Sequence, residues 1–515
     1  MKRLSKFFQD FDEIEWMLIF GVIMLAFVLR WNSFDAPFER DEGEYAYSAL
    51  LLRSGGVLYK DAFLQKPPMI VYTYFLGQLF GDGLWIPRVF AFMASLGVTA
   101  LAFIVSLKEF GKKAALSVLC LITPMLVYPY FTGFSANTEI FMLLPLMGFV
   151  TVYVQGRAEA KMFHLFIGGI LAALSLLYKP IAIWVVVFVF CVWMYEIWVA
   201  KKNMADIVSR AFAFGLGGLI MIFVVMLPVV VSGGWSSFWE SVIVFNAFYA
   251  KQFGYGLGAL AMNVGKMLKG WSLLFVAVTA FFVMRPARWW FWGGVLIVSL
   301  LTVYQSPIGH YYLLLVPFLA IAGAAGLSIV SEKLGISYLL LVGVVVGLMI
   351  WRVRAQFGLT PEEVSVWVYG YENPFVEALV VAEAVARVTT SDDKIFVAGS
   401  EPEILYYSKR ESVSRFVITY PLIINTPVRL QYQKEAVEDL KQNLPEVIVY
   451  SRLKFSGLWD ETSPRDFIDY LNGLIDEKYT LVGAYVWDRG GGHWEENLGE
   501  VIMESSSLLV YKMVI

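Results

Sequence analysis

The stretch Phe38-Glu39-Arg40-Asp41-Glu42-Gly43-Glu44-Tyr45 places five charged side chains within eight residues, directly after the first long hydrophobic run. Charge at the edge of hydrocarbon is costly, so such residues indicate a functional site. Asp41 has two interpretations. Asp followed three residues later by Glu is typical of a helix capping box. A carboxylate fixed at a helix start is also suited to chemistry, so the local pattern leaves both open.

The composition around this stretch is that of a membrane protein. The chain has 515 residues, of which 58% are hydrophobic and only 16% are charged, whereas soluble domains have roughly 25% charged residues. Residues 352–515 contain 16 Lys/Arg and 25 Asp/Glu, which leaves 24 basic and 18 acidic residues for 1–351. We therefore predict two domains, a membrane domain over 1–351 and an acidic soluble domain over 352–515. The acidic balance argues against nucleic acid as a partner.

Eleven segments are predicted to cross the bilayer, since a spanning helix needs roughly 20 apolar residues. Their approximate bounds are 15–31, 85–107, 114–131, 138–155, 162–178, 180–200, 208–231, 271–284, 290–305, 311–330 and 336–351. Lys179-Pro180 interrupts the fifth and sixth, where proline favours a chain reversal. Cys120 and Cys191 lie in apolar runs and are expected to be buried, without a disulfide framework.

The basic residues of the short loops set the orientation, because cytoplasmic loops are enriched in Lys and Arg. An odd number of spans with a cytoplasmic N-terminus places five groups in the cytoplasm: Lys108, Lys112 and Lys113; Arg157 and Lys161; Lys201, Lys202 and Arg210; Arg285 and Arg288; and Lys333. The same orientation places a second set outside: Asp41, Lys66, Glu139, Lys179, His310 and the whole of 352–515.

The first outer loop, 32–84, is predicted to carry two helices lying on the membrane surface. Asp41–Arg53 forms the first, and Pro67–Phe80 forms the second, with proline in its first turn. The soluble domain alternates strands with helices, which predicts a parallel α/β layer. Its strands are expected near Lys394, Glu446, Leu481 and Leu508, and Gly490–His493 is expected to be a loop.

Four motifs in order resemble those of the GT-C glycosyltransferases. They are Asp41-Glu-Gly-Glu-Tyr45-Ala after the first span, Lys66-Pro67, Ala136-Asn-Thr-Glu139 before the fourth span, and Tyr178-Lys179-Pro180. The nearest relatives would be bacterial protein O-mannosyltransferase-like enzymes and the lipid A aminoarabinose transferase. The resemblance covers roughly residues 10–350.

This resemblance implies a polytopic α-helical membrane enzyme with a GT-C fold in the plasma or inner membrane. It would move a sugar, with inversion, from a polyprenyl-phosphate donor to a glycan, lipid or protein acceptor outside the cytoplasm. The resemblance makes Asp41 the catalytic carboxylate that acts on the acceptor hydroxyl. Glu42 and Tyr45, its neighbours in the motif, are expected to bind substrate.

Cations are expected to meet the charge of the departing lipid phosphate. Lys66, Lys179 and Arg88 are the outer candidates, although Lys or Arg that only anchors the chain to headgroups would fit the same positions. Glu139 follows Asn137 at a helix start and is a second catalytic candidate, with dipole stabilisation as the alternative. His310 and Tyr311 begin the tenth span and are expected to contact substrate, with belt residues as the alternative.

No cofactor is expected. In the aminoarabinose transferase an acidic residue before the Lys-Pro pair helps to hold a metal, and Gln65 occupies that place here. An amide is a poor ligand for a transition metal, and His310 has no evident partner, so a divalent metal is doubtful. Two other functions remain open at this point: a transporter or lipid-linked-sugar flippase, and a lipid-binding scaffold without catalysis.

Overall fold

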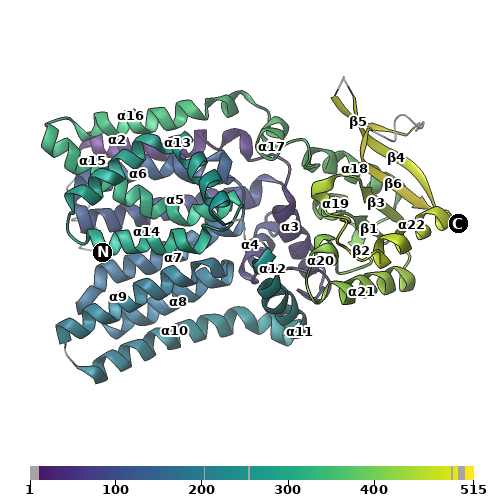
Figure 1. Ribbon diagram of the computed structural model, residues 1–515, viewed down its shortest axis with the longest axis horizontal. Coiled ribbons are helices and arrows are strands. Elements are labelled where there is room, and N and C mark those ends of the chain that lie inside the picture. Colours follow the sequence, from purple (N-terminus) through teal and green to yellow (C-terminus); the bar gives the residue numbers. More distant parts are fainter. Residues whose placement is uncertain (1–10, 202, 253–255, 489–490, 497–504, 515) are drawn as a thin grey trace. The chain divides into compact units, whose positions relative to one another are not determined.

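The computed structural model describes residues 11–201, 203–252, 256–488, 491–496 and 505–514 (Figure 1). Its contacts divide the chain into two compact units. Unit 1 comprises 1–34, 88–225 and 254–359, and unit 2 comprises 35–87, 226–253 and 360–515. The segment 35–87, which contains Asp41, therefore belongs to the same compact unit as the C-terminal residues.

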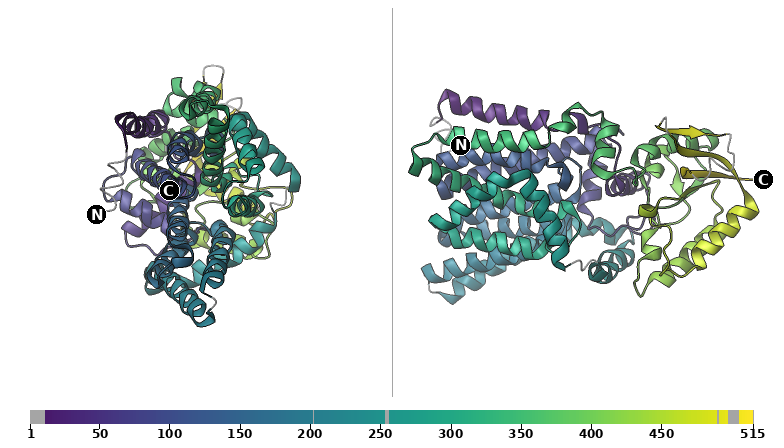
Figure 2. Two further views of the ribbon diagram at one scale, coloured as in Figure 1. Left: turned by 90° about the vertical axis from the view of Figure 1, so that its left-hand side faces the viewer. Right: turned by 45° about the horizontal axis from the view of Figure 1, so that its top comes forward.

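Unit 1 is a bundle of helices (Figures 1 and 2). The α-helices that contribute to it are α2 (Glu13–Val28), α5 (Trp85–Phe110), α6 (Lys112–Leu126), α7 (Thr138–Gly156), α8 (Met162–Tyr178), α9 (Ile183–Lys201), α10 (Met204–Val231), α13 (Gly256–Met284), α14 (Trp289–Val303), α15 (Val316–Leu334) and α16 (Tyr338–Arg352). Short 3₁₀ turns join or follow them: η1 (Trp31–Ser33), η2 (Pro129–Phe131), η3 (Arg157–Glu159), η4 (Pro180–Ala182), η6 (Gly309–Leu315) and η7 (Arg354–Gly358).

Each predicted span corresponds to one of these α-helices within the described residues. In the part of the chain that the structure describes, seven helical stretches are long and apolar enough to cross a membrane, and α8, α14 and α16 are shorter apolar helices. Many large apolar side chains on α10 are exposed, including Leu219 and Phe223, as expected where lipid covers a helix. The protein is a multi-pass membrane protein.

The Lys179-Pro180 break behaves as the sequence predicts. Helix α8 ends at Tyr178, Lys179 is extended, and η4 leads into α9. Helix α13 differs from its predicted span because it begins at Gly256, and its backbone is kinked at Trp271, where φ is −126° and ψ is 27°. The predicted start at 271 therefore marks the kink and not the beginning of the helix.

Unit 2 combines the loop segments with the C-terminal residues. Its helices are α3 (Arg40–Arg53), α4 (Met69–Gln78), α11 (Trp235–Phe238), the π-helix η5 (Trp239–Phe245), α12 (Asn246–Gln252), α17 (Pro361–Tyr369), α18 (Phe375–Val388), α19 (Glu403–Ser408), α20 (Tyr420–Ile423), α21 (Arg429–Gln442), η8 (Lys454–Ser456) and α22 (Asp466–Lys478). Its strands are β1 (Lys394–Ala398), β2 (Glu411–Ser412), β3 (Val447–Ser451), β4 (Tyr479–Asp488), β5 (Gly491–Glu495) and β6 (Ser506–Met513).

The six strands form one sheet in the order β2-β1-β3-β6-β4-β5. β2, β1 and β3 are parallel, whereas β6 is antiparallel to both β3 and β4. The prediction of a parallel layer is therefore correct for one half of the sheet and wrong for the other. β3 pairs antiparallel with β6, with Val449 opposite Val510. Alternation of strands and helices along the chain does not predict this pairing.

The expected loop at Gly490–His493 is also corrected. Gly490 lies outside the described residues, as does Lys202 of the basic loops, but Gly491–Glu495 is strand β5. It pairs antiparallel with β4, with His493 opposite Val486. Glycine is depleted in strands, so a run of glycines predicts a loop even where the backbone forms a strand.

The loop segments and the C-terminal residues share one hydrophobic core. Phe63, from the segment between α3 and α4, packs with Phe245, Phe416 and Tyr432. The Phe63 amide donates to the Arg415 carbonyl oxygen at 2.6 Å. Helices α21 and α22 pack on the same core, which fixes the loop to the C-terminal part of unit 2.

Candidate functional site

The start of α3 is capped by Glu39 and not by Asp41. Glu39 has extended backbone angles, and its carboxylate accepts from the amides of Asp41 at 3.1 Å and Glu42 at 3.3 Å. The Glu42 carboxylate accepts in turn from the Glu39 amide at 3.3 Å, which completes a capping box. The expectation that Asp41 and Glu44 form that box is therefore wrong by two residues.

Asp41 lies in the first turn of α3 beside Lys66. The distance from Asp41 Oδ1 to Lys66 Nζ is 3.8 Å, and the Asp41 side chain is 23% exposed. Lys66 is more deeply buried, and its carbonyl oxygen accepts from the Tyr59 hydroxyl at 2.9 Å. The result is a partly exposed carboxylate with an ammonium group at its side.

The other two predicted residues of this segment are buried. Glu42 is fully buried and serves in the capping box. Tyr45 is also fully buried and packs edge-on against Tyr74 of α4, with ring centroids 5.7 Å apart. Both contacts hold the first helix in place, and the predicted substrate contacts of these two residues stay predictions.

Gly43 allows a close approach within unit 2. A Cβ atom at this position would lie 2.7 Å from both the Cβ and the backbone nitrogen of Glu403, at the start of α19. Three residues before Gly43, Arg40 donates from Nε to the Ser400 carbonyl oxygen at 2.6 Å and lies 3.7 Å from the Glu401 carboxylate. The helix that carries Asp41 is thereby packed tightly against the C-terminal part of the same unit.

Glu44 has no role of its own among the predicted site residues, although it belongs to the motif that contains Asp41. It is 1% exposed and lies one turn after Asp41. Burial raises its pKa to about 8, with Lys66 opposing this shift and Asp41 adding to it. No pattern in the sequence separates this buried acid from an exposed one, since burial depends on α4 and α19.

A second cluster lies in unit 1 and joins four of the predicted residues. Glu139 is fully buried in the first turn of α7, and the Lys179 ammonium group forms an ion pair with its carboxylate. His310 Nε2 lies 3.6 Å from Glu139 Oε1. Lys179 Nζ also lies 3.9 Å from the centroid of the Tyr311 ring. The expectation that His310 lacks a partner is therefore wrong.

Arg88 belongs to unit 1 but makes different contacts. Its side chain is 2% exposed, and Nη1 donates to the Ser33 carbonyl oxygen at 2.8 Å and to the Phe34 carbonyl oxygen at 3.4 Å. These bonds tie the start of α5 to the chain that follows α2. Its predicted role in binding phosphate stays a prediction.

The described part of the chain contains no group of three or more His, Cys, Asp or Glu side chains that could hold a metal ion. Gln65 is nearly buried, and its backbone carbonyl accepts from Asn246 Nδ2 at 2.7 Å. An amide at this position does not fit the ligand set that the resemblance implies. No step is therefore assigned to a metal.

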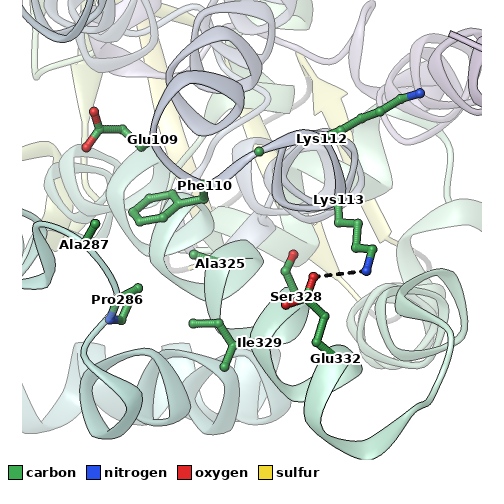
Figure 3. A pocket seen from close by; sticks show the side chains of 11 residues that line it. Glu109, Phe110, Lys112, Lys113, Pro286, Ala287, Ala325, Ser328, Ile329 and Glu332 are labelled. Atoms are coloured by element: carbon green, nitrogen blue, oxygen red, sulfur yellow. Dashed lines mark hydrogen bonds and ion pairs between the residues drawn. The ribbon is translucent and has the colours of Figure 1, made fainter. Parts of the chain in front are cut away.

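The basic loops gather at the opposite end of unit 1 from Glu139. Glu139 lies in the first turn of α7, whereas Arg157 follows its last residue. Arg157 pairs with Glu109, and Arg288 lies 3.6 Å from the same carboxylate. At this end a cavity of about 480 Å³ is lined by residues including Lys112 and Lys113, and Lys113 pairs with Glu332 at 3.0 Å (Figure 3).

Two further cavities, of about 480 and 610 Å³, lie in unit 2. Both are lined by Tyr47, Leu51, Ser54 and Glu411. None of these three cavities is lined by a residue that the sequence analysis assigned to the site.

The fold itself is that of the GT-C glycosyltransferases. No protein-family model matches the sequence, and no curated protein matches it either. A solved structure of ArnT from Cupriavidus metallidurans bound to undecaprenyl phosphate is similar, with a TM-score of 0.63, 13% identity, and 98% of this chain and 99% of that chain covered.

A second similar structure is the Archaeoglobus fulgidus oligosaccharyltransferase tethered to an acceptor peptide. Its TM-score is 0.54 at 12% identity, with 94% of this chain and 74% of that chain covered. Both are GT-C proteins, and at these identities the likeness concerns the fold.

Proposed function

We propose that the protein is a glycosyltransferase that moves a sugar from a polyprenyl-phosphate donor to an acceptor hydroxyl. The observation that carries this proposal is the position of Asp41 within a GT-C fold. Its carboxylate is partly exposed, is fixed in the first helical turn and lies 3.8 Å from Lys66. A polyprenyl-phosphate donor is supported by the similar ArnT structure, which was solved with undecaprenyl phosphate bound.

In the proposed reaction the acceptor oxygen attacks the anomeric carbon of the donor sugar. The bond between that carbon and the phosphate oxygen breaks, and its electron pair leaves with the polyprenyl phosphate. The acceptor proton passes to the Asp41 carboxylate, which acts as general base. Attack opposite the leaving group inverts the configuration of the sugar. The acceptor is a glycan, lipid or protein that offers a hydroxyl, or a phosphate oxygen in its place.

Charge on the departing phosphate would be met by lysine. Lys66 lies beside the carboxylate that receives the proton and is the proposed cation in unit 2. Lys179 is a separate candidate for binding phosphate in unit 1. Because Glu139 is fully buried against Lys179, we assign it the role of orienting Lys179 and His310, and not of contacting the acceptor. Tyr311, under the Lys179 ammonium group, would hold the same lysine.

The proposed location is the cytoplasmic membrane, with the reaction on its outer face. Basic residues favour the cytoplasmic side, and in unit 1 they gather at one end of the bundle. Glu139 and Lys179 lie at the other ends of α7 and α8. This separation supports an outer position for Lys179 and its partners.

A transporter or flippase is less well supported. Transport sites are typically built from charged residues near the middle of broken helices. Here Glu139 lies in the first turn of α7, and Lys179 directly follows the last residue of α8. Charges at helix ends suit a reaction at the membrane surface.

The test is to incubate the purified protein in lipid nanodiscs with polyprenyl-phosphate sugars and a mixture of envelope acceptors. The proposal expects release of free polyprenyl phosphate and appearance of a glycosylated product, both detected by mass spectrometry. Movement of an intact lipid-linked sugar between leaflets of liposomes, without release of polyprenyl phosphate, would contradict it.

A further inference from the structure

Glu44 occupies an unusual position for an acidic residue. It is 1% exposed, and it lies three residues after Asp41 on α3, so the two side chains share one face of the helix. Among the residues that the structure describes, its Oε1 atom has no hydrogen-bond partner. A buried, ionised carboxylate without such partners is strongly disfavoured.

The charged and titratable groups that act on Glu44 come from α3 and from the segment before α4. They are Arg40, Asp41, Tyr59 and Lys66. Beyond them, Tyr72 of α4 interacts with Tyr59, and Glu403 of α19 packs on the adjacent Gly43. Lys66 is the cation that interacts most strongly with Glu44, and it also pairs with Asp41. One ammonium group is thus shared between two carboxyl groups.

This sharing decides what each carboxyl group can do. If both were ionised, Glu44 would repel Asp41 and compete with it for Lys66. If Glu44 is uncharged, Lys66 is left to Asp41 and to the donor phosphate. Two carboxyl groups whose environments differ in this way commonly take different roles in one site.

We propose that Glu44 is a positioning residue of the Asp41 site, which works as an uncharged acid and leaves Lys66 to the reaction. This inference rests on the proposed function. Deprotonation of Glu44 switches the site off by drawing Lys66 away from Asp41. The raised pKa of about 8, caused first by burial, agrees with an uncharged Glu44 at neutral pH. Burial raises the pKa of Tyr72 to about 12 and raises the pKa of Tyr59 well above its usual value, so neither tyrosine titrates in this range.

The first test compares the pH dependence of transfer in the wild type and in Glu44→Gln. Glutamine has the shape of a neutral glutamic acid and also donates hydrogen bonds. The variant should keep turnover within about tenfold at about pH 6, where loss of a general base costs about 10²–10⁴-fold. Wild-type turnover should fall above about pH 8, and this fall should be absent in Glu44→Gln. A folded Glu44→Gln protein as inactive as Asp41→Asn, or one with the alkaline fall unchanged, would overturn the proposal.

Glu403→Gln is the matched control. Glu403 is another buried acid of unit 2 whose pKa is raised by burial, and it packs against Gly43 next to Glu44. The alkaline fall should persist in this variant. Loss of the fall in Glu403→Gln, with the fall retained in Glu44→Gln, would assign the ionisation to Glu403 and overturn the proposal.

The charge of Glu44 also has a readout that does not depend on transfer. Infrared difference spectra of the protein at about pH 6 and above about pH 8 should contain a protonated-carboxyl band that disappears on raising the pH, and Glu44→Gln should lack that component. If the wild type transfers no sugar but this component is present, the proposed function fails while the uncharged state of Glu44 stands. If the component is absent in an active wild type, the inference alone fails.

Discussion

Glu39 accepts a hydrogen bond from the Asp41 amide at 3.1 Å, so the cap of α3 is made two residues before the candidate catalytic carboxylate. The sequence alone allows Asp41 to be either a helix cap or a catalytic carboxylate. In the structure Glu39 is the cap, so Asp41 is not needed for capping. The Asp41 side chain is directed to Lys66 instead. A substitution at Asp41 can therefore be interpreted without loss of the cap.

Gly43→Ala should destabilise unit 2, because the added Cβ would lie 2.7 Å from the Glu403 backbone nitrogen. Overpacking of this kind costs about 1–3 kcal/mol, measurable as a lower unfolding midpoint. Gly473→Ala in α22 is the matched control, since nothing lies within 4 Å of its added Cβ. It should be neutral or stabilising by about 1 kcal/mol through helix propensity. Equal midpoints for both variants would contradict the close packing of α3 on α19.

Lys179→Gln should destabilise the protein, because it leaves the fully buried Glu139 carboxylate without its ion pair. Breaking a buried pair costs about 3–5 kcal/mol. The double variant Lys179→Gln/Glu139→Gln removes both charges and should recover most of this stability. Sugar transfer should stay low in the double variant if Lys179 meets the phosphate. Full recovery of sugar transfer by the double variant would show that the Lys179–Glu139 pair serves only to stabilise the fold.

The stability of unit 2 should fall as the pH rises. Burial raises the pKa of Glu44 to about 8 and of Glu377 to about 7, from ordinary values of 4.5. The folded state then keeps protons that the unfolded state releases between these values, so each group lowers the free energy of unfolding by about 1.4 kcal/mol per pH unit across its window. Denaturant titrations from about pH 5 to 8 should show this decline, and Glu44→Gln should reduce its slope. An increase in stability over the same range would contradict the sign.

Thiol labelling tests the proposed orientation. Ser391 is exposed in unit 2. Lys333 is exposed in the last turn of α15, at the end of unit 1 where the basic residues lie. An impermeant maleimide should label Ser391→Cys in intact spheroplasts, and it should label Lys333→Cys only after permeabilisation. The reverse pattern would put Asp41 and its unit on the cytoplasmic side.

Much of the fold could be predicted because it depends on local properties. Runs of apolar residues predict the bundle helices, and Pro180 predicts the reversal after α8. The helix start at Arg40 could be predicted only to within a residue or two. Glutamate is not a favoured cap residue, and Asp41 fits the motif better than Glu39 does.

Contacts between distant segments could not be predicted in this way. Glu139, Lys179 and His310 were each singled out, but their pairing depends on how α7, α8 and η6 pack. The same holds for Phe63 in the core of unit 2, and for the burial of Glu44. The sequence identifies the ionisable residues, but their burial and partners, which determine whether they are ionised, depend on packing between distant segments.

The measurement that tests the central claim most directly is sugar transfer by Asp41→Asn in nanodiscs. Asparagine keeps the shape of the side chain but cannot accept the acceptor proton, so turnover should fall by about 10²–10⁴-fold with an unchanged unfolding midpoint. Glu39→Ala is the control for the cap. It should lose about 0.5–2 kcal/mol of stability while the folded protein keeps its turnover. Near-normal turnover by a folded Asp41→Asn protein would contradict the account.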